Sequence, residues 1–380
     1  MGFGISQRAA LKLYYGKLTK NKRRIGAAIC RRPEERLLMR SLYAYDFNQI
    51  RDIVTDLKQP AFRAKQIWQF LYQKRIAKLS DMHNLPNALI EKLGQNYAVY
   101  DMSIDRVKVS ADGNTRKYLL NTRDGEQVEC VLLKYAHGYT LCVSSQVGCA
   151  MGCTFCASTI DGIVRHLDAY EMWQQILLVN YDMNIRISRV VMMGSGEPLH
   201  NYRESLKFIK TISSPDHLGL SQRHITLSTC GIVDKIYDLA AEKLQITLAV
   251  SLHTPFDDER NEIVPANRRY SVKQLLEAVD DYFRATSRRV TIEYALIKGK
   301  NDTPAHAEAL VNYLVGKPIH VNLIPINPIE ERSYQPPDKK FVNAFKSRLE
   351  RANIDVTQRR ELGDDIDGAC GQLRRRSADK

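Results

Sequence analysis

The chain carries three thiols at C-x3-C-x2-C spacing in the stretch Gly148-Cys149-Ala150-Met151-Gly152-Cys153-Thr154-Phe155-Cys156, just after a strand-like segment. A glycine-containing loop of this kind can fold its thiolates around one metal centre. Structural zinc usually takes four protein ligands, commonly from two C-x2-C pairs, and no second pair is present. A four-iron cluster on three Cys leaves one iron free for a substrate or cofactor. Three incidental buried thiols are the alternative, but such close spacing argues against it.

Outward from this loop, strand-like and helix-like segments alternate along the chain. Strands are expected at residues 139–143, 189–193, 224–227, 246–251, 290–297 and 320–324. Helices are expected to start at Asp168, at the capping box Ser271…Gln274, at Thr303-Pro304 and at Asp338. The alternation predicts an α/β fold in which a parallel sheet is wrapped by helices as an open or partial (β/α)6 barrel. A flat doubly wound sheet is the competing architecture.

The chain before the barrel has two different patterns. Residues 46–103 carry apolar side chains at helical spacing, which predicts a small helical domain. Residues 104–134 contain short apolar stretches separated by the turn pairs Asp112-Gly113 and Asp124-Gly125, which predict β-hairpins. We therefore expect a basic extension (1–45), a helical domain (46–103), a hairpin connector (104–134), a barrel core (135–362) and a C-terminal segment (363–380).

Length and charge set outer limits on function. The 380 residues have a net charge of +13, of which +9 lies in residues 1–40 and +3 in residues 371–380. Basic ends suit a polyanion such as nucleic acid, although solvated tails or an organellar address in residues 1–40 are alternatives. No run approaches the roughly 18 apolar residues of a membrane span, so we expect a soluble protein. We also expect it to be cytoplasmic and monomeric. Eight cysteines without a signal peptide favour metal or redox chemistry over a disulfide scaffold.

The cysteine motif resembles that of the radical S-adenosylmethionine (SAM) superfamily. In that superfamily the open iron of a [4Fe–4S] cluster binds SAM, and reductive cleavage gives a 5′-deoxyadenosyl radical. The segment Gly194-Ser195-Gly196-Glu197-Pro198 resembles the superfamily's SAM-binding segment after the second strand. Three further segments follow predicted strands, at the carboxyl ends where barrels build their sites: residues 227–231, 251–253 and 324–328.

Two further cysteine segments resemble those of the RlmN/Cfr family of RNA adenine methyltransferases. They are the residues around Cys142 and the segment from Gly363 to Leu373, which contains Cys370. The resemblance implies methylation of C2 of an adenosine in 23S rRNA, at the peptidyl transferase centre, and of adenosine 37 in some tRNAs. It also implies two SAM molecules per methylation, an S-methylcysteine intermediate, a covalent protein–RNA adduct, and an electron donor such as flavodoxin or ferredoxin.

The same resemblance assigns roles to individual residues. It implies cluster ligation by Cys149, Cys153 and Cys156, and SAM contacts from Gly196, Glu197, Ser228, Ser251, Leu252, His253 and Asn327. Cys370 would carry the methyl group, Cys142 would resolve the adduct by forming a disulfide, and Glu129 would accept a proton. Without the resemblance, His253 reads as a structural histidine, and Glu129 reads as a solvated hairpin carboxylate.

Three alternatives stay open at this point. The nearest is the family branch that methylates adenine C8, although Glu197-Pro198-Leu199 and the segment at Pro325 look more like the C2 branch. A radical SAM enzyme that does not methylate is a second alternative, and it would not need the Cys142 and Cys370 pair. A zinc-dependent RNA-binding module is the third. Ser195, Cys230 and Ile326 depart from residues that are common in the family.

Overall fold

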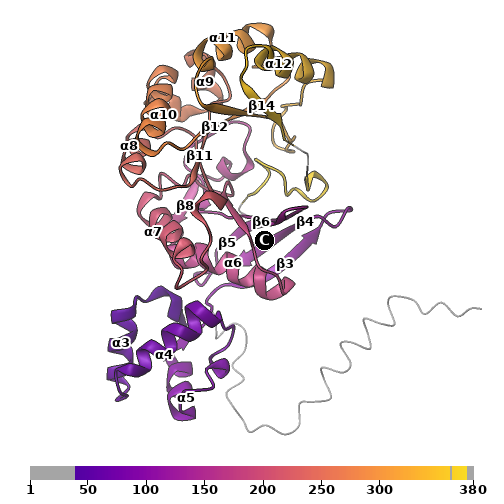
Figure 1. Cartoon of the computed structure of the whole chain (residues 1–380). Helices are drawn as coiled ribbons and strands as arrows, with labels where there is room; N and C mark the ends of the chain where they lie inside the picture. Colours follow the sequence, from indigo (N-terminus) through magenta and orange to yellow (C-terminus); the bar gives the residue numbers. More distant parts are fainter. Residues whose placement is uncertain (1–38, 360–361, 375–380) are drawn as a thin grey trace, which may run out of the picture.

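The computed structural model describes residues 39–359 and 362–374; residues 1–38 of the basic arm, and residues 375–380 of the basic tail, lie outside the described residues. One ten-stranded mixed sheet runs through most of the chain (Figure 1), in the order β14-β13-β12-β11-β10-β9-β6-β5-β4-β3. Seven of its strands are mutually parallel: β6 (Gly138–Cys142), β9 (Arg189–Met192), β10 (Ile225–Thr229), β11 (Thr247–Ser251), β12 (Val290–Leu296), β13 (Ile319–Pro325) and β14 (Asp355–Gln358). The six predicted parallel strands are confirmed, and β14 is a seventh that the sequence did not predict.

Helices cover the outer face of this sheet. They are α6 (Ala169–Met183), α7 (Tyr202–Ser213), α8 (Val233–Ala241), α9 (Asp257–Ile263), α10 (Val272–Thr286), α11 (Pro304–Leu314) and α12 (Lys339–Arg351). The predicted caps are present: Ser271 and Gln274 form a reciprocal capping box, and Pro304 occupies the first turn of α11. Within the described residues, the edge strands β3 and β14 pair with no further strand of this sheet. The fold is therefore an open α/β barrel, as predicted.

The hairpin strands continue the barrel sheet instead of standing apart from it. Strands β3 (Ser103–Val109), β4 (Thr115–Asn121) and β5 (Gln127–Tyr135) are antiparallel, and β5 pairs with β6 from Val131↔Cys142 to Tyr135↔Gly138. The expected boundary between residues 134 and 135 falls inside β5. The division into domains stays a prediction, but the sheet itself is continuous across that point.

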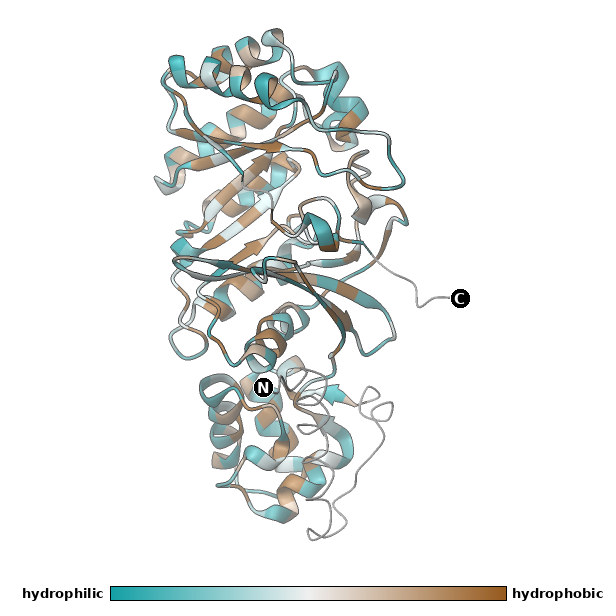
Figure 2. Ribbon diagram, turned by 90° about the vertical axis from the view of Figure 1, so that its right-hand side faces the viewer, coloured by the Kyte–Doolittle hydropathy of each residue, from teal (hydrophilic) through white to brown (hydrophobic). Residues whose placement is uncertain are grey.

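The N-terminal helices form a small unit that contacts α6 through Tyr43 and the nearby Asp101. They are the 3-10 turn η1 (Leu42–Ala44), α3 (Phe47–Asp56), α4 (Phe62–Trp68), the π-helix η2 (Gln69–Lys74), the 3-10 turn η3 (Leu79–Asp81) and α5 (Asn87–Asn96), with a two-stranded sheet of β1 (Arg40–Ser41) and β2 (Tyr97–Ala98). Tyr43 packs edge-on against Trp173 of α6, and Gln174 of α6 donates to Asp101 at 2.8 Å. Figure 2 shows apolar residues concentrated on the strands and the inward sides of the helices. None of the described helices is long and apolar enough to cross a membrane.

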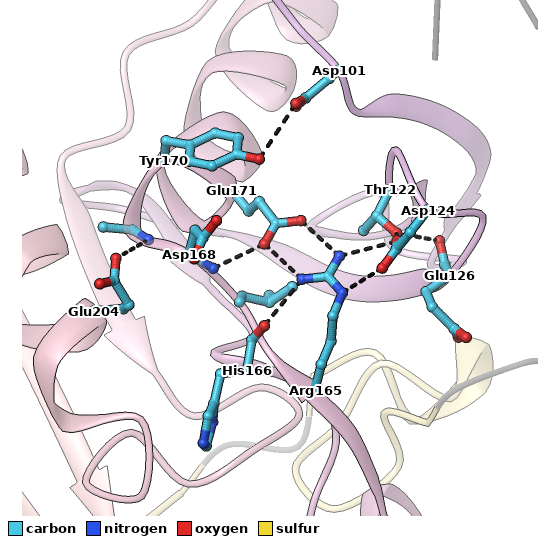
Figure 3. Close-up of polar contacts among 12 residues, drawn as sticks. Asp101, Thr122, Asp124, Glu126, Arg165, His166, Asp168, Tyr170, Glu171 and Glu204 are labelled. Atoms are coloured by element: carbon cyan, nitrogen blue, oxygen red, sulfur yellow. Dashed lines mark hydrogen bonds and ion pairs between the residues drawn. The ribbon is translucent and has the colours of Figure 1, made fainter. Parts of the chain in front are cut away.

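Arg165 ties the hairpin to the barrel (Figure 3). It lies on β8 (Ile163–His166), which pairs with β7 (Gln146–Gly148) beside the main sheet. Its guanidinium binds Asp124 in the turn between β4 and β5 at 2.5 Å, and Glu171 of α6 at 2.8 Å. Although burial raises the pKa of Asp124, hydrogen bonds from Arg165 and Thr122 bring it down to about 2. One cation thus holds three separate elements together.

Candidate active site

The predicted cluster loop is closed at its base by β7 and β8. Gly148 pairs with Ile163, and the Cys149 N–H donates to the Gly162 carbonyl at 3.0 Å. Gly148 has a φ of +74°, and a Cβ atom there would lie 2.0 Å from the Gly162 carbonyl oxygen. Only glycine fits this position, because any side chain would separate the two strands that hold the loop.

Cys149, Cys153 and Cys156 all line one open cavity of about 160 Å³. Burial raises the pKa of Cys149 to about 12, so that bound metal must displace the thiol proton. The described residues hold no group of three Cys, His, Asp or Glu side chains spaced to bind a single metal ion. Three thiolates can each bind a different iron of a four-iron cluster, whereas a structural zinc ion usually takes four protein ligands. The donor set therefore fits an iron–sulfur cluster better than a zinc ion.

Most of the predicted SAM contacts line this same cavity. They come from the carboxyl ends of the parallel strands, as expected for a barrel, and comprise Gly196, Glu197, Ser228, Ser251, His253 and Asn327. Glu197 is buried, which raises its pKa, and its carboxylate accepts backbone N–H groups of Cys230 at 2.7 Å and Leu199 at 2.9 Å. Burial lowers the pKa of His253 to about 3, and its Nδ1 accepts from the Ala295 N–H at 2.9 Å.

Leu252 is buried behind the cavity and is not one of its lining residues. Its carbonyl accepts from Nε of Arg260 at 2.9 Å. Arg260, only 1% exposed, lies on α9 and also donates to the carbonyls of Ser251 and Cys230. Arg260 therefore holds the loops after β10 and β11 in place. The sequence motifs did not predict this role.

Cys142 and Cys370 are brought together although 228 positions separate them in the sequence. Both line a smaller cavity of about 30 Å³, and Cys370 also lines the larger cavity with the three clustered cysteines. Both thiols are free, so the disulfide of the expected cycle is not formed in this structure. Asn327 donates to the Cys370 carbonyl at 3.1 Å, which joins the C-terminal segment to the wall of the larger cavity.

Two charged residues line the cavities beside Cys370, and the sequence did not predict them. Arg359 follows β14 and donates to Sγ of Cys370 at 2.6 Å; Cys370 and the nearby Glu293 raise the pKa of its guanidinium. Glu293 lies on β12, where burial raises its pKa and Asn322 donates to it at 2.8 Å. The sequence signal that could have indicated these residues is a charged residue, Glu293, inside a predicted buried strand.

Glu129 is not a solvated hairpin carboxylate. Glu129 is only 1% exposed, and Lys117 Nζ lies 3.2 Å from Glu129 Oε1. The prediction of a solvated side chain fails because the C-terminal segment covers this face of β5: the Arg374 N–H donates to Glu129 Oε2 at 2.9 Å. The carboxylate lies beneath the segment that carries Cys370.

The comparisons with known proteins define the class first. The model of the radical SAM superfamily matches residues 143–311, and that of the ribosomal RNA large subunit methyltransferase N-terminal domain matches residues 41–99. The crystal structure of a radical SAM methyltransferase from Sphaerobacter thermophilus superposes with a TM-score of 0.84 at 38% identity, covering 88% of this chain and 99% of that one. The fold is that of a radical SAM methyltransferase, and membership of the radical SAM superfamily implies a [4Fe–4S] cluster and SAM as cofactors.

Sequence relatives narrow the class to a family. The "Probable dual-specificity RNA methyltransferase RlmN" of Clostridium novyi (strain NT) is 45% identical over 89% of this chain and 98% of its own length. The protein of the same description from Desulforamulus reducens is 45% identical over 93% of this chain and 100% of its own length. The chain belongs to the RlmN family of radical SAM RNA methyltransferases.

Proposed function

We propose that this enzyme methylates C2 of an adenosine in 23S rRNA, at the peptidyl transferase centre, and adenosine 37 of some tRNAs. The observation that carries the proposal is that Cys370 lines two adjoining cavities. It shares one with Cys142 and the other with the three clustered cysteines. A methyl carrier needs this placement, because its sulfur must face both the methyl donor and the RNA base. The printed description of the relatives as dual-specificity enzymes supports two RNA substrates.

The residues of the larger cavity fit the cofactors of the superfamily. Cys149, Cys153 and Cys156 would hold the cluster, and Gly196, Glu197, Ser228, Ser251, Leu252, His253 and Asn327 would bind or support SAM. When bound, these groups supply a methyl group and a hydrogen-abstracting radical, with two SAM molecules consumed per methylation. His253, neutral at pH 7 because of its lowered pKa, presents no charge to the sulfonium.

The two remaining thiols and Glu129 perform the steps on the RNA side. Adenine C2 is an electron-poor sp2 carbon and no nucleophile, so the methyl group is carried on the Cys370 sulfur. After one hydrogen atom has been removed from it, its carbon adds to C2 as a radical, and the adduct would then lose one electron to the cluster. Glu129 accepts the proton that C2 loses. Cys142, as its thiolate, then forms an S–S bond with Cys370 as the bond from the Cys370 sulfur to the transferred carbon breaks, and that carbon takes up a proton to become the product methyl group. An external dithiol must reduce this disulfide before the next cycle.

Partners follow from the same chemistry. One electron must reach the cluster from a small carrier such as flavodoxin or ferredoxin. We propose that the enzyme acts as a monomer in the cytoplasm. Residues 1–40 would serve as an RNA-binding arm or as an address.

Nucleoside analysis tests the proposal. Ribosomal RNA and tRNA that lack the modification are treated separately with the reconstituted enzyme, digested and analysed by mass spectrometry. We expect 2-methyladenosine from both RNAs and none with Cys370→Ala. If 8-methyladenosine appears instead, the C2 assignment is wrong. If Cys370→Ala keeps full turnover, the methyl-carrier mechanism is wrong.

A further inference from the structure

A buried ion pair lies under the C-terminal segment. Lys117 of β4 and Glu129 of β5 meet at 3.2 Å, and their side chains are only 3% and 2% exposed. Removing two charges from water is costly, and such a pair adds little to stability compared with apolar residues of the same size. An arrangement of this kind calls for a role other than holding the fold together.

The pair contacts both ends of the segment that bears Cys370. Lys117 Nζ donates to the Asp367 carbonyl at 3.0 Å, three residues before Cys370. Glu129 Oε2 accepts the Arg374 N–H at 2.9 Å, four residues after Cys370. The turn between these two points is therefore held from below by one lysine and one carboxylate.

The sheet explains why these side chains meet. Lys108, Lys117, Val131 and Cys142 are paired in register across β3, β4, β5 and β6. Residues paired directly across a sheet project from the same face, and Glu129 is two positions from Val131 on β5. Lys117, Glu129 and Cys142 thus share the face that the C-terminal segment covers.

We propose that Lys117 is a positioning residue, which holds the Glu129 carboxylate and the Asp367 carbonyl at one point and so fixes the proton acceptor relative to the methyl carrier. This inference rests on the proposed roles of Glu129 and Cys370. The Arg374 contact occupies one oxygen of Glu129 and has to open when the base reaches that carboxylate. The Lys117 contact engages the other oxygen and keeps the acceptor in place while the tail moves.

The chain contains a matched control on the same rung of the sheet. Lys108 is the direct cross-strand partner of Lys117 and also reaches Asp367, through the carboxylate at 3.4 Å, but its side chain is 38% exposed. Lys117→Met, Lys117→Arg and Lys108→Met are compared in the full-length protein by hydrogen–deuterium exchange of residues 363–374, with β12 as the internal fold control. The double variant Lys117→Met/Glu129→Gln leaves no unpaired buried charge, in case the single variant folds poorly.

In Lys117→Met and in the double variant, we expect the segment to exchange about tenfold faster while β12 keeps its protection. Lys117→Arg restores most of the protection, and Lys108→Met behaves like the wild type. In the anaerobically reconstituted holoenzyme, S-methylation of Cys370 by SAM slows about tenfold in Lys117→Met and recovers in Lys117→Arg. Wild-type exchange and wild-type S-methylation in Lys117→Met would overturn the proposal.

Failure of this inference and failure of the proposed function give different results. If Lys117→Met matches the wild type while Cys370→Ala abolishes product, only the role of Lys117 is wrong. If Cys370→Ala keeps full turnover, the carrier mechanism and the positioning role that rests on it are both wrong. The exchange measurement then still reports whether Lys117 docks the segment.

Discussion

Adding one methyl group to Gly148 should prevent cluster binding without unfolding the barrel. The new Cβ would lie 2.0 Å from the Gly162 carbonyl oxygen, on the rung that closes the cluster loop. We expect Gly148→Ala to bind less than about one tenth of the wild-type iron after anaerobic reconstitution. Iron per chain and the visible absorption band are the measurements, with far-ultraviolet circular dichroism as the fold check.

Gly113 provides the matched control for this substitution. Its φ of +70° is close to that of Gly148, but a Cβ there would meet no atom within 4 Å. Gly113→Ala therefore has a similar backbone strain of about 1 kcal/mol and should bind iron fully. Equal iron in Gly148→Ala and wild type would show that the loop tolerates the clash.

Cys142 should make the resolution step strongly dependent on pH. Burial raises the pKa of its thiol to about 12, so the thiolate that attacks a sulfur is scarce at neutral pH. Between pH 7 and pH 9 the thiolate fraction rises about tenfold per unit, and we expect the rate of adduct decay to rise in parallel. Rapid quenching and gel analysis of the protein–RNA adduct measure this rate. A flat profile would show that another step limits decay.

At the scale of elements, Arg260 connects α9 with the loops after β10 and β11. Its guanidinium donates to the carbonyls of Leu252, Ser251 and Cys230. Arg260→Met leaves these acceptors unsatisfied, and we expect the free energy of unfolding to fall by about 3 kcal/mol and SAM affinity to fall with it. Urea unfolding and calorimetric titration with SAM measure the two effects.

An exposed arginine nearby gives the comparison for Arg260. Arg269 pairs with Asp234 at the surface, with side chains 73% and 56% exposed. Arg269→Met should change the free energy of unfolding by less than about 0.5 kcal/mol. A similar loss of unfolding free energy in both variants would show that the buried hydrogen bonds of Arg260 stabilise the fold no more than an exposed ion pair does.

The turn between β4 and β5 should contribute stability that depends on pH. The pKa of Asp124 is about 2 in the folded protein, below its ordinary value, so its contribution is present above about pH 4 and is lost as pH falls through 2. Because the side chain is 44% exposed, we expect Asp124→Asn to cost only about 1 kcal/mol at pH 7. Urea unfolding should show this difference shrinking below pH 4, and a constant difference would contradict it.

Across the whole molecule, the sequence predicted those helices and strands that are specified by residues close together in the chain. The apolar strands and the caps at Ser271 and Pro304 depend on neighbouring residues, and they are present. The four-residue edge strand β14 was missed because three of its residues are exposed and polar, which leaves no apolar run to detect. The burial of Glu129 was also missed, since it depends on a contact with Arg374, 245 positions away. The individual site roles stay predictions.

The basic arm carries most of the net charge of the chain. Residues 1–40 carry net +9 in a chain of +13. A chain that starts at residue 41 should bind tRNA roughly tenfold more weakly at moderate salt, with a flatter dependence of log affinity on log salt. Fluorescence anisotropy over a salt series measures both quantities. An unchanged slope would assign the arm to solubility or targeting.

The docking of the C-terminal segment has a consequence for biosynthesis. Asp367 reaches Lys117, 250 positions earlier, and Arg374 reaches Glu129 across 245 positions. The hairpin strands can pair soon after they leave the ribosome, whereas the segment that covers them is made about 245 residues later. A nascent or truncated chain can therefore complete its barrel without completing its reaction centre. In the proposed mechanism, methyl transfer can begin only once the segment that carries Cys370 has docked on the sheet.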